Sequence, residues 1–210
     1  MASIDVSRAL TIPGWLSEQE ALRLAIQASR ASVIAEIGSW RGRSTRAMAD
    51  NTNGIIFAID PFSDEAVGYP GWWTAQESPD KYKQKDWLWH EFESNLREYI
   101  GKRVIPVRMF SAYAYEHLEP RGVKFDFIFI DGSHDFGHVT GDIQMFSRLL
   151  KSNSLISGHD YNEPTCPEVA PAVNAQFQRI MLGPGTIWYA VFDHHAHDSS
   201  SIPVESLSVA

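Results

Sequence analysis

The hydrophobic positions of the chain fall into short continuous apolar runs separated by stretches with helical spacing. Four runs read as buried strands: Val33–Ile37, Ile55–Ile59, Val104–Val107 and Phe125–Ile130. Two more strands are expected at 155–157 and 186–192, the last antiparallel after the turn-forming sequence Gly-Pro-Gly at 183–185. Strands without in/out alternation that are separated by helical stretches indicate a parallel sheet covered on both faces.

Helical signals lie between these runs. Residues 17–20 match a capping box and precede an amphipathic stretch, and further helices are predicted at 44–50 and around 139–150. The pattern predicts one doubly wound α/β domain over residues 1–192, followed by a flexible tail at 193–210 that is rich in Ser, His and Pro. In such sheets the ligand binds outside the carboxyl ends of the strands, near the point where the strand order switches.

Composition narrows the class of partner. The 210 residues suffice for one globular domain, and a formal charge of −8 argues against a nucleic-acid partner. Cys166 is the only cysteine, so no intramolecular disulfide can form, and we interpret it as structural because no base lies near it in sequence. No apolar run is long enough to span a membrane, and the N-terminal region lacks the apolar core of a signal peptide. We therefore expect a cytoplasmic protein.

The loop after the first strand carries the strongest ligand-binding signal. Gly38 permits a tight turn, and Gly42 is expected to let the backbone approach a ligand closely. The two glycines do not have the G-x-G-x-x-G spacing of a dinucleotide site. Asp60 ends the next strand about 20 residues after the first glycine, where an acid can bind ribose hydroxyls. The pattern favours a nucleoside ligand.

The motif Glu-x-Gly-x-x-x-Gly-x-Ser at 36–44 resembles the first motif of class I S-adenosylmethionine-dependent methyltransferases. It is most similar to the metal-dependent O-methyltransferases of the catechol and macrolide-sugar type. The resemblance implies a Rossmann-like, mostly parallel seven-stranded sheet with helices on both faces and S-adenosylmethionine as the methyl donor. It also implies a set of donor-binding residues: Glu36, Gly38, Trp40, Gly42, Ser44, Asp60, Ser111 and Asp131.

A second group of polar residues follows the fourth and fifth strands. Asp131 and Asp160 end strands that would lie about 4.8 Å apart, so the two carboxylates could share a cation such as Mg²⁺. Without a cation they would repel, and one of them would take up a proton. His159 could be a third ligand, although imidazole suits Mn, Fe or Zn better than Mg.

The spacing Asp-x-x-His at 131–134 and the following His-Asp-Tyr resemble the sugar O-methyltransferase branch, and the likeness runs from about residue 17 to 192. It implies that Asp131, His159 and Asp160 hold the metal and that His134 is the general base. The chain departs from that branch at His159 and Tyr161, where its members carry a second carboxylate or an Asp-Asn pair. The identity of the metal, Mg or Mn, and the need for one therefore both stay open. We expect Asp135 to start the next helix and Asp142 to be a structural partner.

The segment 61–100 is aromatic-rich and has two interpretations, a lid over the strand ends or a packed core or subunit interface of a homo-oligomer. Its aromatic residues are Tyr69, Trp72, Trp73, Tyr82, Trp87 and Trp89. The predicted function is methyl transfer to a hydroxyl of a sugar or phenol, with a small-molecule acceptor and neither nucleic acid nor membrane as partner. The alternatives are a non-methylating hydrolase or oxygenase-like enzyme on the same fold and a catalytically silent donor-binding protein.

Overall fold

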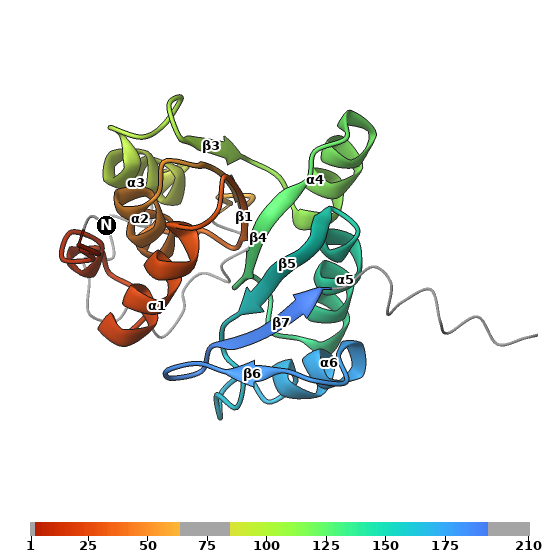
Figure 1. Ribbon diagram of the computed structural model, residues 1–210. Coiled ribbons are helices and arrows are strands. Elements are labelled where there is room, and N and C mark those ends of the chain that lie inside the picture. Colours follow the sequence, from red (N-terminus) through yellow and green to blue (C-terminus); the bar gives the residue numbers. More distant parts are fainter. Residues whose placement is uncertain (1–2, 64–84, 193–210) are drawn as a thin grey trace, which may run out of the picture.

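The computed structural model describes residues 3–63 and 85–192 and contains a seven-stranded sheet (Figure 1). The strand order is β3-β2-β1-β4-β5-β7-β6. The strands are β1 (Val33–Ile37), β2 (Ile55–Ile59), β3 (Val104–Val107), β4 (Phe125–Ile130), β5 (Leu150–Gly158), β6 (Met181–Leu182) and β7 (Trp188–Phe192). The first five pair in parallel, whereas β7 runs antiparallel to both β5 and β6. The predicted mostly parallel sheet with an antiparallel last strand is confirmed.

Helices cover both faces of this sheet (Figure 1). One side holds α1 (Glu18–Ala28), α2 (Arg43–Asn51) and α3 (Trp87–Leu96), and the other holds α4 (Ser111–Leu118), α5 (Phe136–Ser147) and α6 (Val169–Gln176). Two short 3₁₀ turns, η1 (Ala9–Thr11) and η4 (Glu119–Arg121), complete the described elements. None of the described helices is long and apolar enough to cross a membrane.

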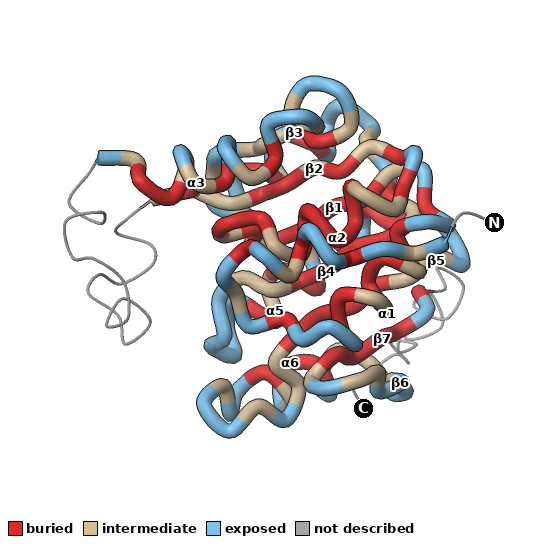
Figure 2. The backbone as a smooth tube through the Cα atoms, turned by 90° about the vertical axis from the view of Figure 1, so that its left-hand side faces the viewer, coloured by how far each residue is buried: buried red, intermediate tan, exposed pale blue. Residues whose placement is uncertain are grey.

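The central strand β4 explains why the sheet is apolar on both faces. Phe127 and Phe129 pack into the core beneath α1 to α3, whereas Ile128 and Ile130 pack into the core beneath α4 to α6. Successive strand residues point to opposite faces, so a strand covered on both sides must be apolar throughout. Figure 2 shows the buried residues following the central strands, with exposed residues on the outer helices and loops.

Two predicted boundaries were wrong. The helix expected around 139–150 ends at Ser147, and the strand expected at 155–157 begins at Leu150. The first part of β5 lacks an apolar signal because residues 151–153 are polar and exposed, and Asn153 has a positive φ of 61°. The pairing with β4 also changes register there. No prediction covered α3, α4, α6 or β6, and none of the three helices has a side-chain N-cap bond.

The described part of the aromatic-rich segment belongs to the core. Trp87 is 3% exposed in α3, and the Trp89 ring packs against Phe62 and Phe92 at centroid distances of 5.4 Å and 6.0 Å. The Arg108 guanidinium lies 4.6 Å from the Trp89 ring centroid. Trp87 is buried and Trp89 partly buried in the core on this side of the sheet. Whether the segment as a whole is a lid, a packed core or an interface stays a prediction. Tyr69, Trp72, Trp73, Tyr82 and the tail at 193–210 lie outside the described residues.

Candidate active site

Gly38 joins three strand ends at the switch point between β1 and β4. Its φ is +85°, and its N–H donates to the Ile59 carbonyl oxygen at 2.9 Å. A Cβ atom at this position would lie 2.1 Å from the carbonyl oxygen of Asp131. Positive φ and this close approach both require glycine. The loop that follows β1 is therefore fixed directly against the residue that follows β4.

Asp60 lies against the same loop. Its Oδ2 accepts hydrogen bonds from the N–H groups of Ser39 at 3.0 Å and Trp40 at 2.9 Å, and its Oδ1 accepts from the Phe62 N–H at 2.6 Å. Burial raises the pKa of Asp60, and these three backbone bonds oppose the rise. A carboxylate has about four acceptor positions, so one stays available to a ligand hydroxyl. The structure thus brings the two predicted parts of the donor site together.

Glu36 and Ser44 lie beneath this loop rather than on its exposed side. Glu36 is fully buried, and its Oε2 accepts hydrogen bonds from Ser39 Oγ at 2.7 Å and from the Thr45 hydroxyl. Burial raises the pKa of Glu36 to about 7, opposed by the hydroxyls of Ser44, Thr45 and Ser39. Ser44 is itself buried. Both side chains stabilise the shape of the loop, and their predicted part in binding the donor stays a prediction.

Gly42 and Trp40 also differ in what they contact. Gly42 has φ +87° at the start of α2, and a Cβ there would lie 2.3 Å from Cδ2 of Leu96. Glycine is therefore needed at this position for the packing of α3, and the contact of Gly42 with a ligand stays a prediction. Trp40 keeps its predicted place in the loop, where its ring lies 4.5 Å from that of Trp15 and under the Arg41 guanidinium. Trp15 is 52% exposed.

Ser111, the predicted adenine neighbour, begins α4. Its hydroxyl hydrogen-bonds the buried carboxyl group of Asp142. Burial raises the pKa of Asp142 to about 6, and the bond from Ser111 opposes this rise. The structural role expected for Asp142 agrees with this contact. Asp135 caps α5 by accepting the His138 N–H at 3.0 Å, as predicted.

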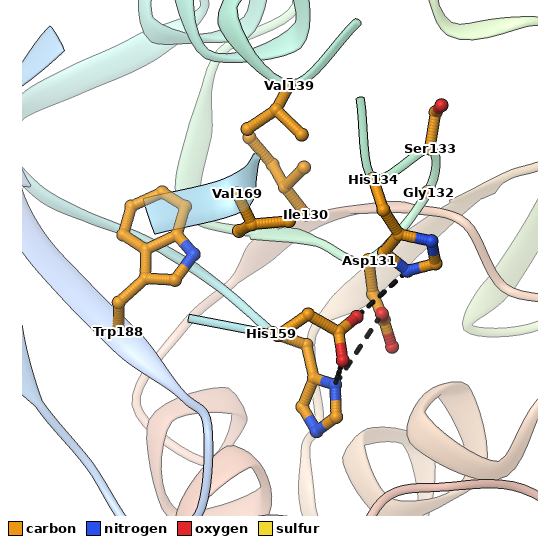
Figure 3. A pocket seen from close by; sticks show the side chains of 10 residues that line it. Ile130, Asp131, Gly132, Ser133, His134, Val139, His159, Val169 and Trp188 are labelled. Atoms are coloured by element: carbon orange, nitrogen blue, oxygen red, sulfur yellow. Dashed lines mark ion pairs between the residues drawn. The ribbon is translucent and has the colours of Figure 1, made fainter. Parts of the chain in front are cut away.

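The second group gathers where β4 and β5 end (Figure 3). The parallel register pairs Ile130 with Gly158, so Asp131 and His159 follow side by side. His159 Nδ1 lies 3.1 Å from Asp160 Oδ1 and 3.8 Å from Asp131 Oδ1, and His134 Nε2 lies 2.9 Å from Asp160 Oδ2. The pocket that these side chains line has a volume of about 10 Å³, roughly the space for one water molecule or ion.

The two carboxyl groups differ in their protonation, as the sequence predicted. Burial and the charge of Asp160 raise the pKa of Asp131 to about 7, while His159 opposes that rise. Burial also works to raise the pKa of Asp160, but hydrogen bonds from His134 and His159 hold it well below its usual range. The same hydrogen bond to Asp160 raises the pKa of His134. Asp160 is therefore the stronger acid of the pair.

Glu20 is a site residue that the sequence analysis missed. Its Oε2 accepts from Ser17 N at 2.7 Å, which is the predicted capping box. Its Oε1 accepts from Thr186 N at 2.9 Å and faces His159 Nε2 at 3.1 Å. Burial raises the pKa of Glu20, but the bonds from His159, Ser17 and Thr186 lower it to about 2. The sequence shows the capping box, but it does not show that Glu20 Oε1 contacts Thr186 and His159.

The residues around His159 fit a divalent cation. Asp131, His159 and Asp160 each offer one ligand atom, and these atoms lie within 4.8 Å of one another. Glu20 on the far nitrogen orients the ring as carboxylates orient metal-binding imidazoles. Burial lowers the pKa of His159, but the surrounding carboxylates raise it to about 11. Protonated His159 therefore supplies a positive charge among these carboxylates, and a cation bound at Nδ1 would replace the proton on that atom.

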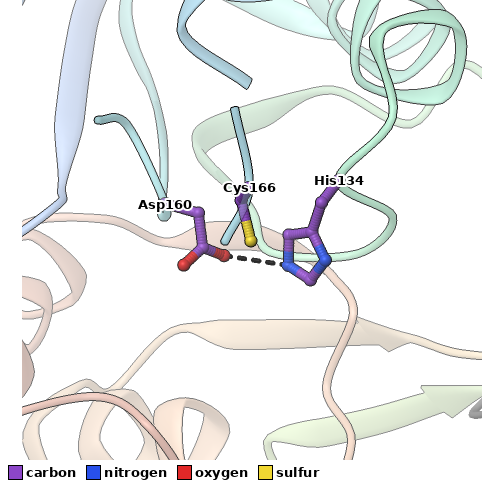
Figure 4. A group of neighbouring side chains, drawn as sticks. All are labelled: His134, Asp160 and Cys166. Carbon is purple, nitrogen blue, oxygen red and sulfur yellow. Dashed lines mark ion pairs between the residues drawn. The ribbon is translucent and has the colours of Figure 1, made fainter. Parts of the chain in front are cut away.

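Cys166 does have a base beside it in space, contrary to the expectation from its sequence neighbours. Its thiol, the His134 imidazole and the Asp160 carboxylate offer ligand atoms that lie within 4.8 Å of one another (Figure 4). Burial and the charge of Asp160 raise the pKa of the Cys166 thiol. A thiol with a raised pKa is a poor nucleophile at neutral pH, which agrees with the predicted absence of nucleophilic function.

The fold and the site together define an α/β protein whose ligand-binding loop and acid–histidine cluster meet at the carboxyl ends of the parallel strands. Residues 35–161 match the family described as methyltransferase domain, and the chain belongs to this family. No curated protein matches the chain.

Solved structures that resemble the chain share its fold at low sequence identity. An O-methyltransferase from Bacillus cereus in complex with SAH is 20% identical, with a TM-score of 0.57, over 88% of this chain and 86% of that chain. The O-methyltransferase TomG from Streptomyces achromogenes in complex with SAM is 14% identical, with a TM-score of 0.60, over 90% and 87%. CalS11, a TDP-rhamnose 3'-O-methyltransferase, is 16% identical, with a TM-score of 0.56, over 84% and 82%.

Proposed function

We propose that this methyltransferase transfers the methyl group of S-adenosylmethionine to a hydroxyl oxygen of a small molecule, a sugar or a phenol. The observation that carries the proposal is the His134–Asp160 pair next to the donor loop. His134 follows β4, which adjoins β1, Asp160 follows β5, the next strand of the sheet, and His134 is 47% exposed. The fold neighbours support the choice of donor and acceptor, since two are bound to SAM or SAH and one is named for a sugar hydroxyl.

Donor binding falls to the loop after β1 and to Asp60. The remaining acceptor position of the Asp60 carboxylate would take a ribose hydroxyl of the donor, while its other positions hold the backbone of the loop at Ser39 and Trp40. Asp131, in contact with Gly38, lies between the donor loop and the histidines. Glu36 and Ser44 support the loop from below.

His134 is the proposed general base. Because Nε2 donates its hydrogen to Asp160 Oδ2 in the neutral tautomer, Nδ1 carries the lone pair that accepts a proton. The acceptor hydroxyl gives its proton to Nδ1 while its oxygen bonds the methyl carbon and the carbon–sulfur bond breaks. The products are a methyl ether, S-adenosylhomocysteine and protonated His134. Asp160 holds the tautomer and stabilises the imidazolium.

Asp131, His159 and Asp160 would hold a divalent cation beside this base. When bound, Mg²⁺ or Mn²⁺ would supply positive charge that lowers the pKa of the acceptor hydroxyl. The imidazole among the ligands favours Mn²⁺. Cytoplasmic location, homo-oligomer formation and the absence of nucleic-acid and membrane partners stay predictions from the sequence.

The test combines calorimetric titration with S-adenosylhomocysteine, with and without Mg²⁺ or Mn²⁺, and transfer of labelled methyl groups to a panel of nucleotide sugars and catechols. His134→Ala should abolish transfer and keep donor binding, and Asp131→Asn should do the same with little effect on donor affinity. His138→Ala is the matched control, since this exposed histidine of α5 contacts Asp135 instead. Transfer that persists in His134→Ala, or a wild type that does not bind S-adenosylhomocysteine, contradicts the proposal. Donor binding without transfer to any acceptor favours the silent donor-binding alternative.

A further inference from the structure

We infer that His134, Asp160 and Cys166 form a second cation site, which takes a borderline or soft divalent ion of the zinc class. The three residues come from three separate segments: the loop after β4, the first turn after β5, and the turn that leads into α6. Their ligand atoms lie within 4.8 Å of one another (Figure 4). A nitrogen, a carboxylate oxygen and a sulfur are the three kinds of ligand that zinc takes from proteins.

The chemistry of the ligands separates this site from the one around His159. Thiolate sulfur binds zinc and similar ions and is a poor ligand for Mg²⁺. Asp160 has one oxygen for each site, since Oδ1 faces His159 at 3.1 Å and Oδ2 faces His134 at 2.9 Å. Three protein ligands leave a fourth tetrahedral position to water.

The backbone holds these ligands in place and leaves the site accessible. The Cys166 N–H donates to the Glu163 carbonyl oxygen at 2.9 Å, and the Cys166 carbonyl oxygen accepts from the Val169 N–H at 3.2 Å. Asp160 is held through its N–H by Thr186 Oγ1 at 3.1 Å. His134 is half-exposed and Cys166 is partly exposed, so an ion can enter from solvent. Binding replaces the thiol proton by the metal and releases that proton.

A metal at this site has a direct consequence for the reaction, and this part of the inference rests on the proposed function. Zinc on Nε2 of His134 leaves the remaining ring proton on Nδ1, the atom proposed as the base. The imidazole then has no lone pair for the acceptor proton. Zinc is therefore expected to inhibit methyl transfer by holding His134 in the wrong tautomer.

The test uses cobalt(II) as a spectroscopic probe for zinc in the full-length protein. Cys166 is the only cysteine of the chain, so a sulfur-to-cobalt charge-transfer band reports this residue and neither the sulfur-free site around His159 nor the tail histidines. We expect the band in the wild type, its displacement by zinc, and its loss in Cys166→Ser. Zinc affinity should fall by roughly tenfold or more in that variant. Binding of S-adenosylhomocysteine and the thermal unfolding midpoint report whether the variant is folded.

Two outcomes overturn the inference. One is a wild type without the charge-transfer band at saturating cobalt, and the other is an equal zinc affinity in the wild type and in a folded Cys166→Ser variant. Neither measurement requires turnover, so failure here is distinct from failure of the proposed methyl transfer. Where an acceptor is found, zinc inhibition relative to each protein's own rate with Mg²⁺ or Mn²⁺ and without zinc should be weaker in Cys166→Ser.

Discussion

Substitution of Glu36 by glutamine removes a carboxyl group that lies fully buried beneath the donor loop. Glutamine has nearly the same shape, and the hydroxyls of Ser39 and Thr45 that now donate to Oε2 can donate to the amide oxygen or accept from its N–H groups. Packing is therefore conserved, and the main change is that the variant cannot ionise. The comparison isolates the energetic cost of a charge in this position.

The magnitude follows from the pKa of Glu36, which burial raises from 4.5 to about 7. The pKa of this carboxyl group is higher in the folded protein than in the unfolded chain. As the pH rises from the unfolded-state pKa to the folded-state pKa, the unfolded chain loses the proton first, and the unfolding free energy therefore falls. At about 1.4 kcal/mol per pH unit, the unfolding free energy of the wild type should fall by about 3 kcal/mol relative to Glu36→Gln between pH 4.5 and 7. Above pH 7 the difference should stay constant.

Urea unfolding of both proteins at half-unit intervals from pH 5 to 8 measures this difference directly. Titrating groups that do not interact with Glu36 contribute equally to both proteins and cancel, so the difference reports Glu36 together with its coupling to Asp60 and Asp131. Glu116→Gln, which removes an exposed carboxyl group of α4, controls for the change in net charge. If the difference in unfolding free energy between wild type and Glu36→Gln is the same at every pH in this range, Glu36 does not titrate there and the reasoning is refuted.

Three further substitutions test other parts of the site. Gly38→Ala would place a methyl group 2.1 Å from the carbonyl oxygen of Asp131 and should cost more than about 3 kcal/mol of unfolding free energy. The control Gly101→Ala has a similar φ of +76° and nothing within 4 Å of the added methyl group, so it should cost about 1 kcal/mol. Equal costs for the two variants would contradict the packing argument. Glu20→Ala leaves the buried His159 without its carboxylate partner and should cost about 3 kcal/mol in urea unfolding. Asp60→Asn should weaken S-adenosylhomocysteine roughly tenfold or more by calorimetry, and an unchanged affinity would exclude its proposed contact with the donor.

The sequence predicted which residues lie at the strand ends of the site better than it predicted what each of these residues contacts. Asp60, Asp131 and Asp160 were expected at one edge of the sheet, and the structure places them there, because the carboxyl ends of parallel strands share an edge. Gly42 was expected to let the backbone approach a ligand, and the structure shows that the side of Gly42 where a Cβ would stand packs against Leu96 of α3. A glycine with positive φ signals a close approach, but its neighbours do not show which group approaches.

Predictions also failed where the local signal was weak. Residues 151–153 of β5 are polar and exposed, so only the pairing with β4 and β7 identifies them as strand. Trp87 and Trp89 lie in a helix without a capping signal, since Asp86, the N-cap residue of α3, makes no side-chain cap bond. Their burial depends on packing against α2 and the sheet, and the pattern of neighbouring residues in the sequence does not predict such contacts.

What the sequence by itself determined is the set of features that a few neighbouring residues specify: the apolar runs of the parallel strands, the capping box at Ser17 and the polar residues that end each strand. The tertiary structure decided which of these residues meet. Glu20 and His159 are separated by 139 positions along the chain, yet their side chains lie 3.1 Å apart in the folded protein. Cys166 likewise reaches His134 only because the turn before α6 folds back over the ends of β4 and β5. Such contacts arise from the packing of whole elements, and no spacing within one segment encodes them.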